Sequence, residues 1–168
     1  MILLVLAACA SAPDRAVEPD LRPPAGSTAE VLTMADGAEL VARHWASIDA
    51  APRAVVVIVH DRGADSTRHA GLAARLAAAG YSVYAFDLRG HGRSSGPRGG
   101  PDGRKLHVAD LERYAAAIAT REPGRPILAI GYGLGAKVAA GARGIDAVLA
   151  DPPTEAEILA WLAAQQPA

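Results

Sequence analysis

Apolar residues of this chain gather in short runs that are separated by polar stretches rich in glycine and proline. The run at 55–59 is continuous and consists of valine and isoleucine alone. Such a run of β-branched residues is typical of a strand that is buried on both faces of a parallel sheet. Three further apolar runs predict strands at 81–86, at 127–130 and at 147–150.

Between these runs, the apolar residues recur at helical spacing. In the segment 68–79, Leu72, Leu76 and Ala79 lie on one face, and Gly80 follows at the position of a C-terminal cap. The same spacing predicts further helices at 108–119, at 137–143 and after Thr154, which forms a capping box with Glu157.

Two segments before the first buried run alternate between apolar and polar residues. They cover 29–34 and 39–45 and flank Asp36-Gly37, which is a strong signal for a tight hairpin. Downstream of the hairpin, strands alternate with helices. This order predicts an α/β domain with a doubly wound, mostly parallel sheet and right-handed crossovers.

Composition narrows the range of functions. The 168 residues are 51% hydrophobic and 21% charged, which is enough for one globular domain with its own core. The net charge of -1 gives no attraction to nucleic acid, so no nucleic-acid partner is expected. No spacing of metal ligands is present, and the glycine-rich stretch 90–103 lacks the Gly-Lys-Ser/Thr ending of a phosphate loop. We therefore expect neither a metal nor a cofactor.

The N-terminus carries a distinct signal around Cys9, the only cysteine. Residues 1–8 are apolar and end in Leu-Ala-Ala directly before it, which resembles the lipobox of bacterial lipoproteins. This implies a signal segment 1–9, lipid on Cys9, and an extracytoplasmic, membrane-anchored protein, at the outer membrane if the host is Gram-negative. The alternative is a piece of core strand that contains a cysteine. Prolines and charges in 10–27 predict an extended tether before the domain 28–168.

The stretch Gly131-Tyr132-Gly133-Leu134-Gly135 joins the predicted strand 127–130 to a helix. It has both outer glycines of the G-x-S-x-G nucleophile elbow, but Gly133 stands where the serine should be. Ligands of doubly wound sheets bind outside the carboxyl ends of the strands. Because His60 and Asp87 also follow strand ends, we expect them to share one crevice with the elbow.

Two further sequence stretches follow the predicted strands. The strand at 55–59 ends in His60-Asp61-Arg62-Gly63, and the strand at 81–86 is followed by Asp87-Leu88-Arg89-Gly90-His91-Gly92-Arg93-Ser94. Together with the elbow, they resemble the monoacylglycerol lipase and lysophospholipase branch, of serine aminopeptidase type, of the α/β-hydrolase superfamily. The resemblance runs over residues 29–153. It implies an α/β-hydrolase fold that is incomplete at its C-terminal end, and an ester-bearing lipid as the ancestral substrate.

The resemblance also implies a triad in the order serine, acid, histidine. Gly133 has no side chain with which to attack, and all five histidines precede the elbow. No catalytic residue is therefore assigned. Asp151, after the last predicted strand, is either the acid of such a triad or a solvated residue that starts the turn with Pro152 and Pro153; we favour the turn.

The resemblance places an oxyanion hole at the backbone N–H of Leu134 and in the loop after His60. His60 itself is expected to be structural and to bond the backbone beneath the site. Asp61 replaces the glycine of the family pattern, and a carboxylate there would repel an oxyanion. We expect Asp61 to cap the helix at 68–79, or to pair with Arg62 or Arg89.

The sequence thus predicts a lipid-anchored, α/β-hydrolase-like protein without hydrolase activity, that is, a pseudoenzyme. Its expected partners are the membrane, through Cys9, and an apolar or ester-like small ligand. Two alternatives stay open at this point. One is a carboxylic ester or lipid hydrolase that works only with a second chain or through other chemistry. The other is a truncated, non-functional remnant.

Overall fold

The computed structural model describes residues 24–97 and 103–165. The predicted signal segment 1–9, with Cys9, and most of the predicted tether 10–27 lie outside the described residues. No helix within the described part of the chain is long and apolar enough to cross a membrane.

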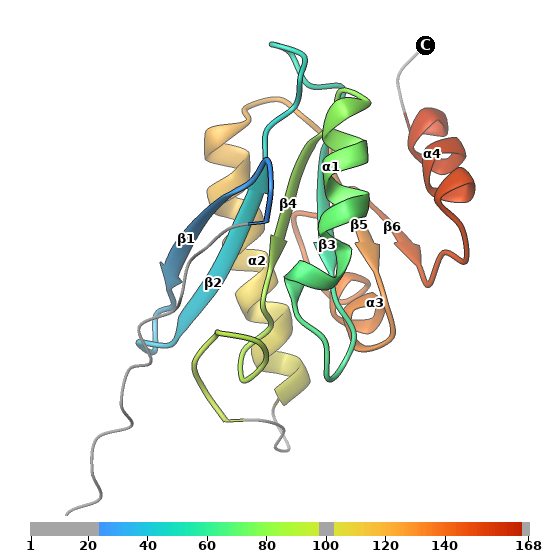
Figure 1. Cartoon of the computed structure of the whole chain (residues 1–168). Coiled ribbons are helices and arrows are strands. Elements are labelled where there is room, and N and C mark those ends of the chain that lie inside the picture. Colours follow the sequence, from blue (N-terminus) through green and yellow to red (C-terminus); the bar gives the residue numbers. More distant parts are fainter. Residues whose placement is uncertain (1–23, 98–102, 166–168) are drawn as a thin grey trace, which may run out of the picture.

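The centre of the molecule is a six-stranded sheet with the strand order β1-β2-β4-β3-β5-β6 (Figure 1). The hairpin pair β1 and β2 is antiparallel, and β2 also runs antiparallel to β4, whereas the other neighbours are parallel. The prediction of a mostly parallel sheet is confirmed. The strands are β1 (Thr28–Thr33), β2 (Glu39–Trp45), β3 (Val55–Val59), β4 (Ser82–Phe86), β5 (Ile127–Gly131) and β6 (Ala147–Ala150).

Helices cover both faces of this sheet. Leu111 and Ile118 of α2 and Val138 of α3 join one core cluster, whereas Leu76 of α1 and Ile158 of α4 join the other. The view in Figure 1 agrees, with α1 in front of the sheet and α2 behind it. The helices are α1 (Ala70–Ala78), which follows the 3-10 turn Ser66–His69, α2 (Gly103–Arg121), α3 (Leu134–Ala139) and α4 (Glu155–Ala164).

The strand β3 shows why a continuous apolar run marks the centre of such a sheet. All five of its residues are buried. Val55, Val57 and Val59 pack into the cluster under α2, while Val56 and Ile58 pack into the cluster under α1. Both faces of the strand are therefore covered, which no alternating polar pattern would allow.

Helix starts differ from the predicted ones. The helix expected at 68–79 begins with a 3-10 turn whose N-cap is Asp65, and the helix expected at 108–119 spans Gly103–Arg121. The helix expected at 137–143 instead covers Leu134–Ala139. This helix starts earlier because the elbow sets its first residue, a constraint that apolar spacing alone does not reveal.

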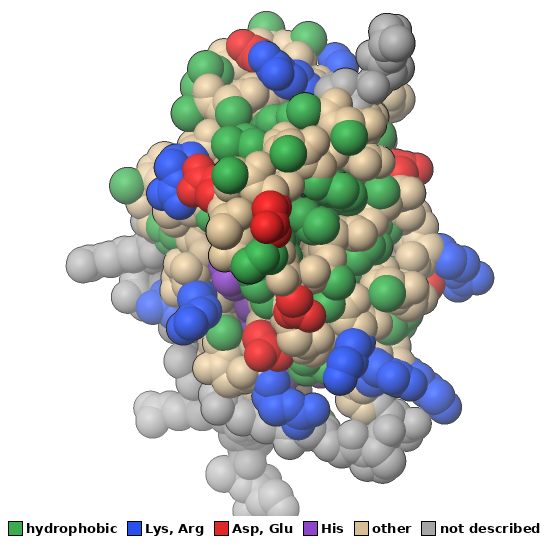
Figure 2. Space-filling model, turned by 90° about the vertical axis from the view of Figure 1, so that its right-hand side faces the viewer, with side chains coloured by type: hydrophobic (Ala, Val, Ile, Leu, Met, Phe, Trp, Pro, Cys, Tyr) green, Lys and Arg blue, Asp and Glu red, His purple; other side chains and the backbone are tan. Residues whose placement is uncertain are grey.

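Near the C-terminus, the cap at Thr154 lies as predicted, and its hydroxyl accepts from the N–H of Glu157 at 3.2 Å. The helix α4 then covers the sheet beside β6, which has no strand partner on its outer edge among the described residues. Figure 2 shows this side of the molecule, where hydrophobic side chains gather in the middle of the view and charged ones stand around them. Leu159 of α4 is 39% exposed here.

Candidate functional site

The elbow is a sharp turn from β5 into α3 that only glycines permit. Gly133 has φ 52° and ψ −107°. This conformation is energetically unfavourable for any residue that has a side chain. A Cβ on Gly135 would overlap the carbonyl oxygen of Val59, and a Cβ on Gly131 would overlap the backbone of Ala136. Strand and helix therefore pass each other at backbone contact, as the sequence predicts.

The space where a nucleophile side chain would begin is already occupied. A Cβ on Gly133 would overlap both carboxylate oxygens of Asp61. The position thus lacks a reactive atom and also lacks room for one while Asp61 keeps its present conformation. Sequence reasoning identified the missing serine but not the side chain that fills its place.

Asp61 is held at the elbow by two backbone donors. Its Oδ1 accepts from the N–H of Leu134 at 2.6 Å and from the N–H of Arg62 at 2.7 Å. These hydrogen bonds hold the pKa of the Asp61 carboxyl below its ordinary value. The carboxylate is therefore the anion that the Leu134 N–H binds in this structure.

Two expectations for Asp61 were wrong. The helix cap is Asp65, whose Oδ1 accepts from the N–H of Thr67 at 2.8 Å. Arg89 pairs with Asp110 at 2.7 Å and also with Asp36. Arg62 does contact Asp61, but the hydrogen bond comes from its backbone N–H. The carboxylate also binds the N–H of Leu134 at the start of α3. Because α3 is far away in the sequence, sequence spacing does not reveal this contact.

A second carboxylate bonds the next amide of the elbow. Oδ1 of Asp151 accepts from the N–H of Gly133 at 2.6 Å. Asp151 also has φ 47°, the one positive φ among the described residues other than glycine. Asp151 is exposed and lies at the bend before Pro152 and Pro153, as the favoured expectation has it, and its side chain in addition caps the elbow.

His60 has no nitrogen available for catalysis. Its side chain is fully buried, its Nε2 accepts from the N–H of Leu88 at 2.9 Å, and its Nδ1 donates to the carbonyl of Asp61 at 2.7 Å. Burial lowers the pKa of His60. The ring joins the loop after β3 to the loop after β4 and keeps one tautomer in doing so.

Asp87 organises the loops beside the elbow. It is buried, accepts from the N–H of Ser66 at 2.8 Å and the N–H of Arg93 at 2.9 Å, and pairs with Arg43 at 3.2 Å. Ser94, in turn, donates to the carbonyl of Asp87 at 2.5 Å. Apart from the Nε of Arg43, which has no hydrogen-bond partner, these groups bond one another and hold the loops together.

Tyr132 and His69 form a contact that sequence reasoning did not anticipate. Their rings stack with centroids 4.2 Å apart and an angle of 10° between their planes. Both line an open hollow of about 440 Å³ beside Pro152 and Thr154. The only signal was that Tyr132 lies between two elbow glycines, which says nothing about its partner.

A second hollow lies on the other side of Gly133. Its volume is about 450 Å³, and its lining residues are Asp61, Arg62, Arg104, Gly133, Leu134 and Lys137. It therefore opens directly onto the place where the family would carry its nucleophile. The predicted single crevice shared by His60, Asp87 and the elbow is not found, because His60 and Asp87 are buried and line neither hollow. Only the elbow residues Tyr132, Gly133 and Leu134 open onto these hollows.

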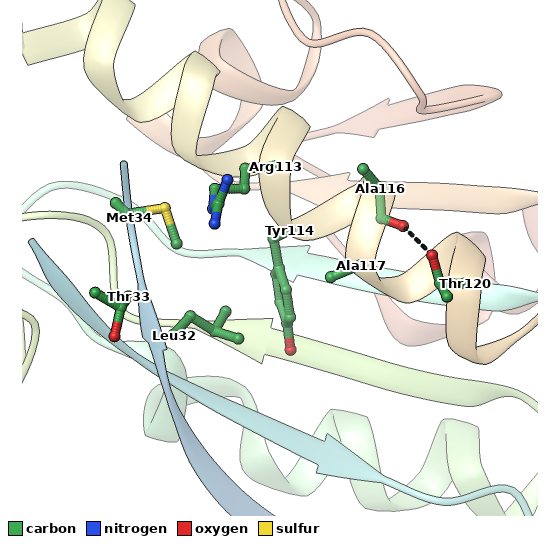
Figure 3. Close-up of a pocket in the computed structure, with 8 residues that line it drawn as sticks. All are labelled: Leu32, Thr33, Met34, Arg113, Tyr114, Ala116, Ala117 and Thr120. Atoms are coloured by element: carbon green, nitrogen blue, oxygen red, sulfur yellow. Dashed lines mark hydrogen bonds between the residues drawn. The ribbon is translucent and has the colours of Figure 1, made fainter. Parts of the chain in front are cut away.

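A third, more apolar pocket lies away from the elbow, between β1 and α2 (Figure 3). It measures about 390 Å³, and in the close-up the side chains of Leu32 and Met34 face Tyr114 across it. Its lining residues are Leu32, Thr33, Met34, Arg113, Tyr114, Ala116, Ala117 and Thr120. Within the described ranges, no group of three or more His, Cys, Asp or Glu residues is placed to hold a metal ion.

Comparison with known proteins agrees with this geometry. Residues 50–154 match the family model of serine aminopeptidase, S33. The monoglyceride lipase of Homo sapiens is 31% identical over 108 residues, which cover 64% of this chain and 35% of that protein. The monoacylglycerol lipase of Mycolicibacterium smegmatis is 36% identical over 99 residues, covering 59% of this chain and 35% of that protein.

Solved structures show the same fold. A thermostable carboxyl esterase from Bacillus coagulans superposes with a TM-score of 0.66 at 23% identity, over 76% of this chain and 44% of that one. The chain spans about a third of the length of these two lipases.

Proposed function

The chain belongs to the serine aminopeptidase S33 family of α/β-hydrolases, in its monoglyceride lipase-like branch, and we propose that it binds a ligand at the elbow without hydrolysing it. The single observation that carries this proposal is the state of position 133. Gly133 offers no nucleophile, and the Asp61 carboxylate fills the space in front of it.

Repulsion by the Asp61 carboxylate also argues against hydrolysis. One oxyanion-hole donor supplies about 3–4 kcal/mol of transition-state stabilisation. The N–H of Leu134 would be such a donor, but Asp61 already holds it at 2.6 Å. A second negative charge about 4 Å from this carboxylate would be repelled by roughly 4 kcal/mol at an effective dielectric of 20. The repulsion cancels what the donor would contribute.

The second part of the proposal concerns location. We propose that Cys9 carries lipid and anchors the domain to a bacterial membrane on its extracytoplasmic side, at the outer membrane if the host is Gram-negative. The apolar run before Cys9 and the proline-rich segment after it support this reading. A tethered binding domain would then meet its ligands at the membrane surface.

A labelling experiment tests the absence of serine-hydrolase chemistry. Purified protein is treated with a fluorophosphonate probe and assayed with short-chain nitrophenyl esters, beside an active esterase at equal concentration. We expect no covalent adduct and no turnover above buffer, since Gly133 cannot be acylated. An adduct located by mass spectrometry on any serine of the chain would refute the proposal and would name the nucleophile.

A further inference from the structure

The hollow beside Gly133 has a charge pattern that neither the fold nor the loss of the serine requires. Three cationic side chains line it: Arg62 after β3, Arg104 at the start of α2, and Lys137 on α3. They come from three separate elements, so no single helix face accounts for their convergence.

None of these three side chains forms an ion pair with another described residue. Other arginines do have such partners; for example, Arg75 pairs with Glu155 at 2.7 Å and Arg143 with Glu112 at 3.1 Å. Among the described residues, the positive charge at the hollow is therefore not neutralised by ion pairs.

Asp61 is the one acidic residue among the described residues that line the hollow. Its carboxylate already occupies the N–H of Leu134, so a ligand anion would be held by the cationic side chains. Three positive charges and one negative charge leave the lining with a net charge of +2. A carboxylate ligand would neutralise half of that charge, whereas a phosphate monoester, which carries about −1.5 to −2 at pH 7, matches all of it.

The volume of the hollow also suits a small-molecule ligand. Its volume of about 450 Å³ lies within the range of roughly 300–1,000 Å³ that is usual for small-molecule sites. A phosphate group alone would fill a small part of it. The backbone of Gly133 and the side chain of Leu134 leave room for the organic part of a monoester.

We propose that the hollow lined by Arg62, Arg104 and Lys137 binds a phosphate monoester, with the cations holding the phosphate away from the Asp61 carboxylate. The proposal rests on the elbow acting in binding rather than hydrolysis. The same chemistry occurs in a soluble sugar or glycerol phosphate and in the headgroup of phosphatidic acid. In both cases, the phosphate is recognised by charge-assisted hydrogen bonds.

Binding of inorganic phosphate and of glycerol 1-phosphate by the full chain tests the site, measured by calorimetry at low and at physiological salt. Arg104→Gln and Lys137→Gln should each weaken binding about tenfold or more, as expected for the loss of one charged donor. Arg113→Gln is the matched control, because Arg113 lies on the same helix as Arg104 but lines the pocket of Figure 3. Asp61→Asn should tighten binding, since it removes the one negative charge.

Vesicles distinguish the two sources of the ligand. Binding to phosphatidic acid vesicles, but not to phosphatidylcholine vesicles, indicates the lipid headgroup, and binding of glycerol 1-phosphate alone indicates a soluble ligand. The proposal is overturned if phosphate shows no saturable binding, if acetate binds equally well, or if Arg113→Gln weakens binding as much as Arg104→Gln. Thermal unfolding confirms that each variant is folded. Fluorophosphonate labelling reports separately on hydrolysis, so the two proposals can fail independently.

Discussion

At the scale of single residues, the site is defined by a contact between two positions 72 apart in the sequence. Gly133 and Asp61 occupy the volume that a nucleophile would need, and the N–H of Leu134 fixes the carboxylate there. A new side chain at 133 therefore meets both an unfavourable φ of 52° and an occupied space.

This contact predicts the outcome of restoring the serine. Gly133→Ser should lower the free energy of unfolding by about 1–3 kcal/mol from backbone strain, with an added cost from displacing Asp61. The double variant Gly133→Ser, Asp61→Gly should recover part of that loss. Both should remain inactive on nitrophenyl esters, because both nitrogens of His60 are engaged with backbone groups. Urea denaturation and ester assays measure the two effects; burst-phase turnover by either variant would contradict this account.

At the scale of elements, the sequence predicts the buried parts better than the ends. The strand at 55–59 matches the structure residue for residue, because a continuous apolar run that is buried on both faces has no alternative placement. The strand at 147–150 also matches, although its residues are partly buried or exposed. Helix starts were missed where a distant contact sets them, as at Leu134. Distant contacts also limit what the sequence predicts of the candidate site. The missing serine is visible in the local sequence, whereas the contacts of Asp61 and Asp151 with the elbow depend on tertiary structure.

The contribution of the N-cap of α4 to stability can be measured by mutation. Thr154→Ala removes the hydroxyl that accepts from the N–H of Glu157, and should cost about 1 kcal/mol of stability. The matched control is Thr120→Ala on α2, whose hydroxyl bonds the carbonyl of Ala116 inside its own helix. That change should stay within about 0.5 kcal/mol. If chemical denaturation gives equal losses for the two variants, Thr154 does not act as a cap.

At the scale of the whole molecule, burial of histidines couples stability to pH. Burial lowers the pKa of His44, His60, His69 and His107 below the usual 6.5. The unfolded chain then binds more protons than the folded one below about pH 6.5, so stability is present above that pH and falls as the solution is acidified.

Urea denaturation at pH 7.5 and at pH 5.5 measures this coupling, and we expect a lower free energy of unfolding at pH 5.5. His107→Gln should flatten the dependence, because His107 is buried and its Nδ1 has no hydrogen-bond partner. A free energy of unfolding that is equal at the two pH values, or higher at pH 5.5, would show that these histidines do not control acid stability.

The proposed membrane attachment also concerns the whole chain. Cys9→Ser should move the protein from the membrane fraction to the soluble fraction, because the serine cannot take the lipid that we propose as the anchor. Fractionation after expression in a bacterial host, with metabolic labelling by a fatty acid, measures this. Unchanged membrane association of the variant would rule out lipid on Cys9 as the anchor.

The contact between Gly133 and Asp61 also bears on how such a site can change during evolution. A serine regained at position 133 would collide with Asp61, while a glycine regained at position 61 would leave the Leu134 amide without its acceptor. Each single reversion is therefore disfavoured on its own, and only the pair restores an open elbow. Each of the two substitutions therefore makes reversion of the other unfavourable. Lineages that carry both are expected to keep them, and to adapt the elbow to new ligands rather than return to the ancestral form.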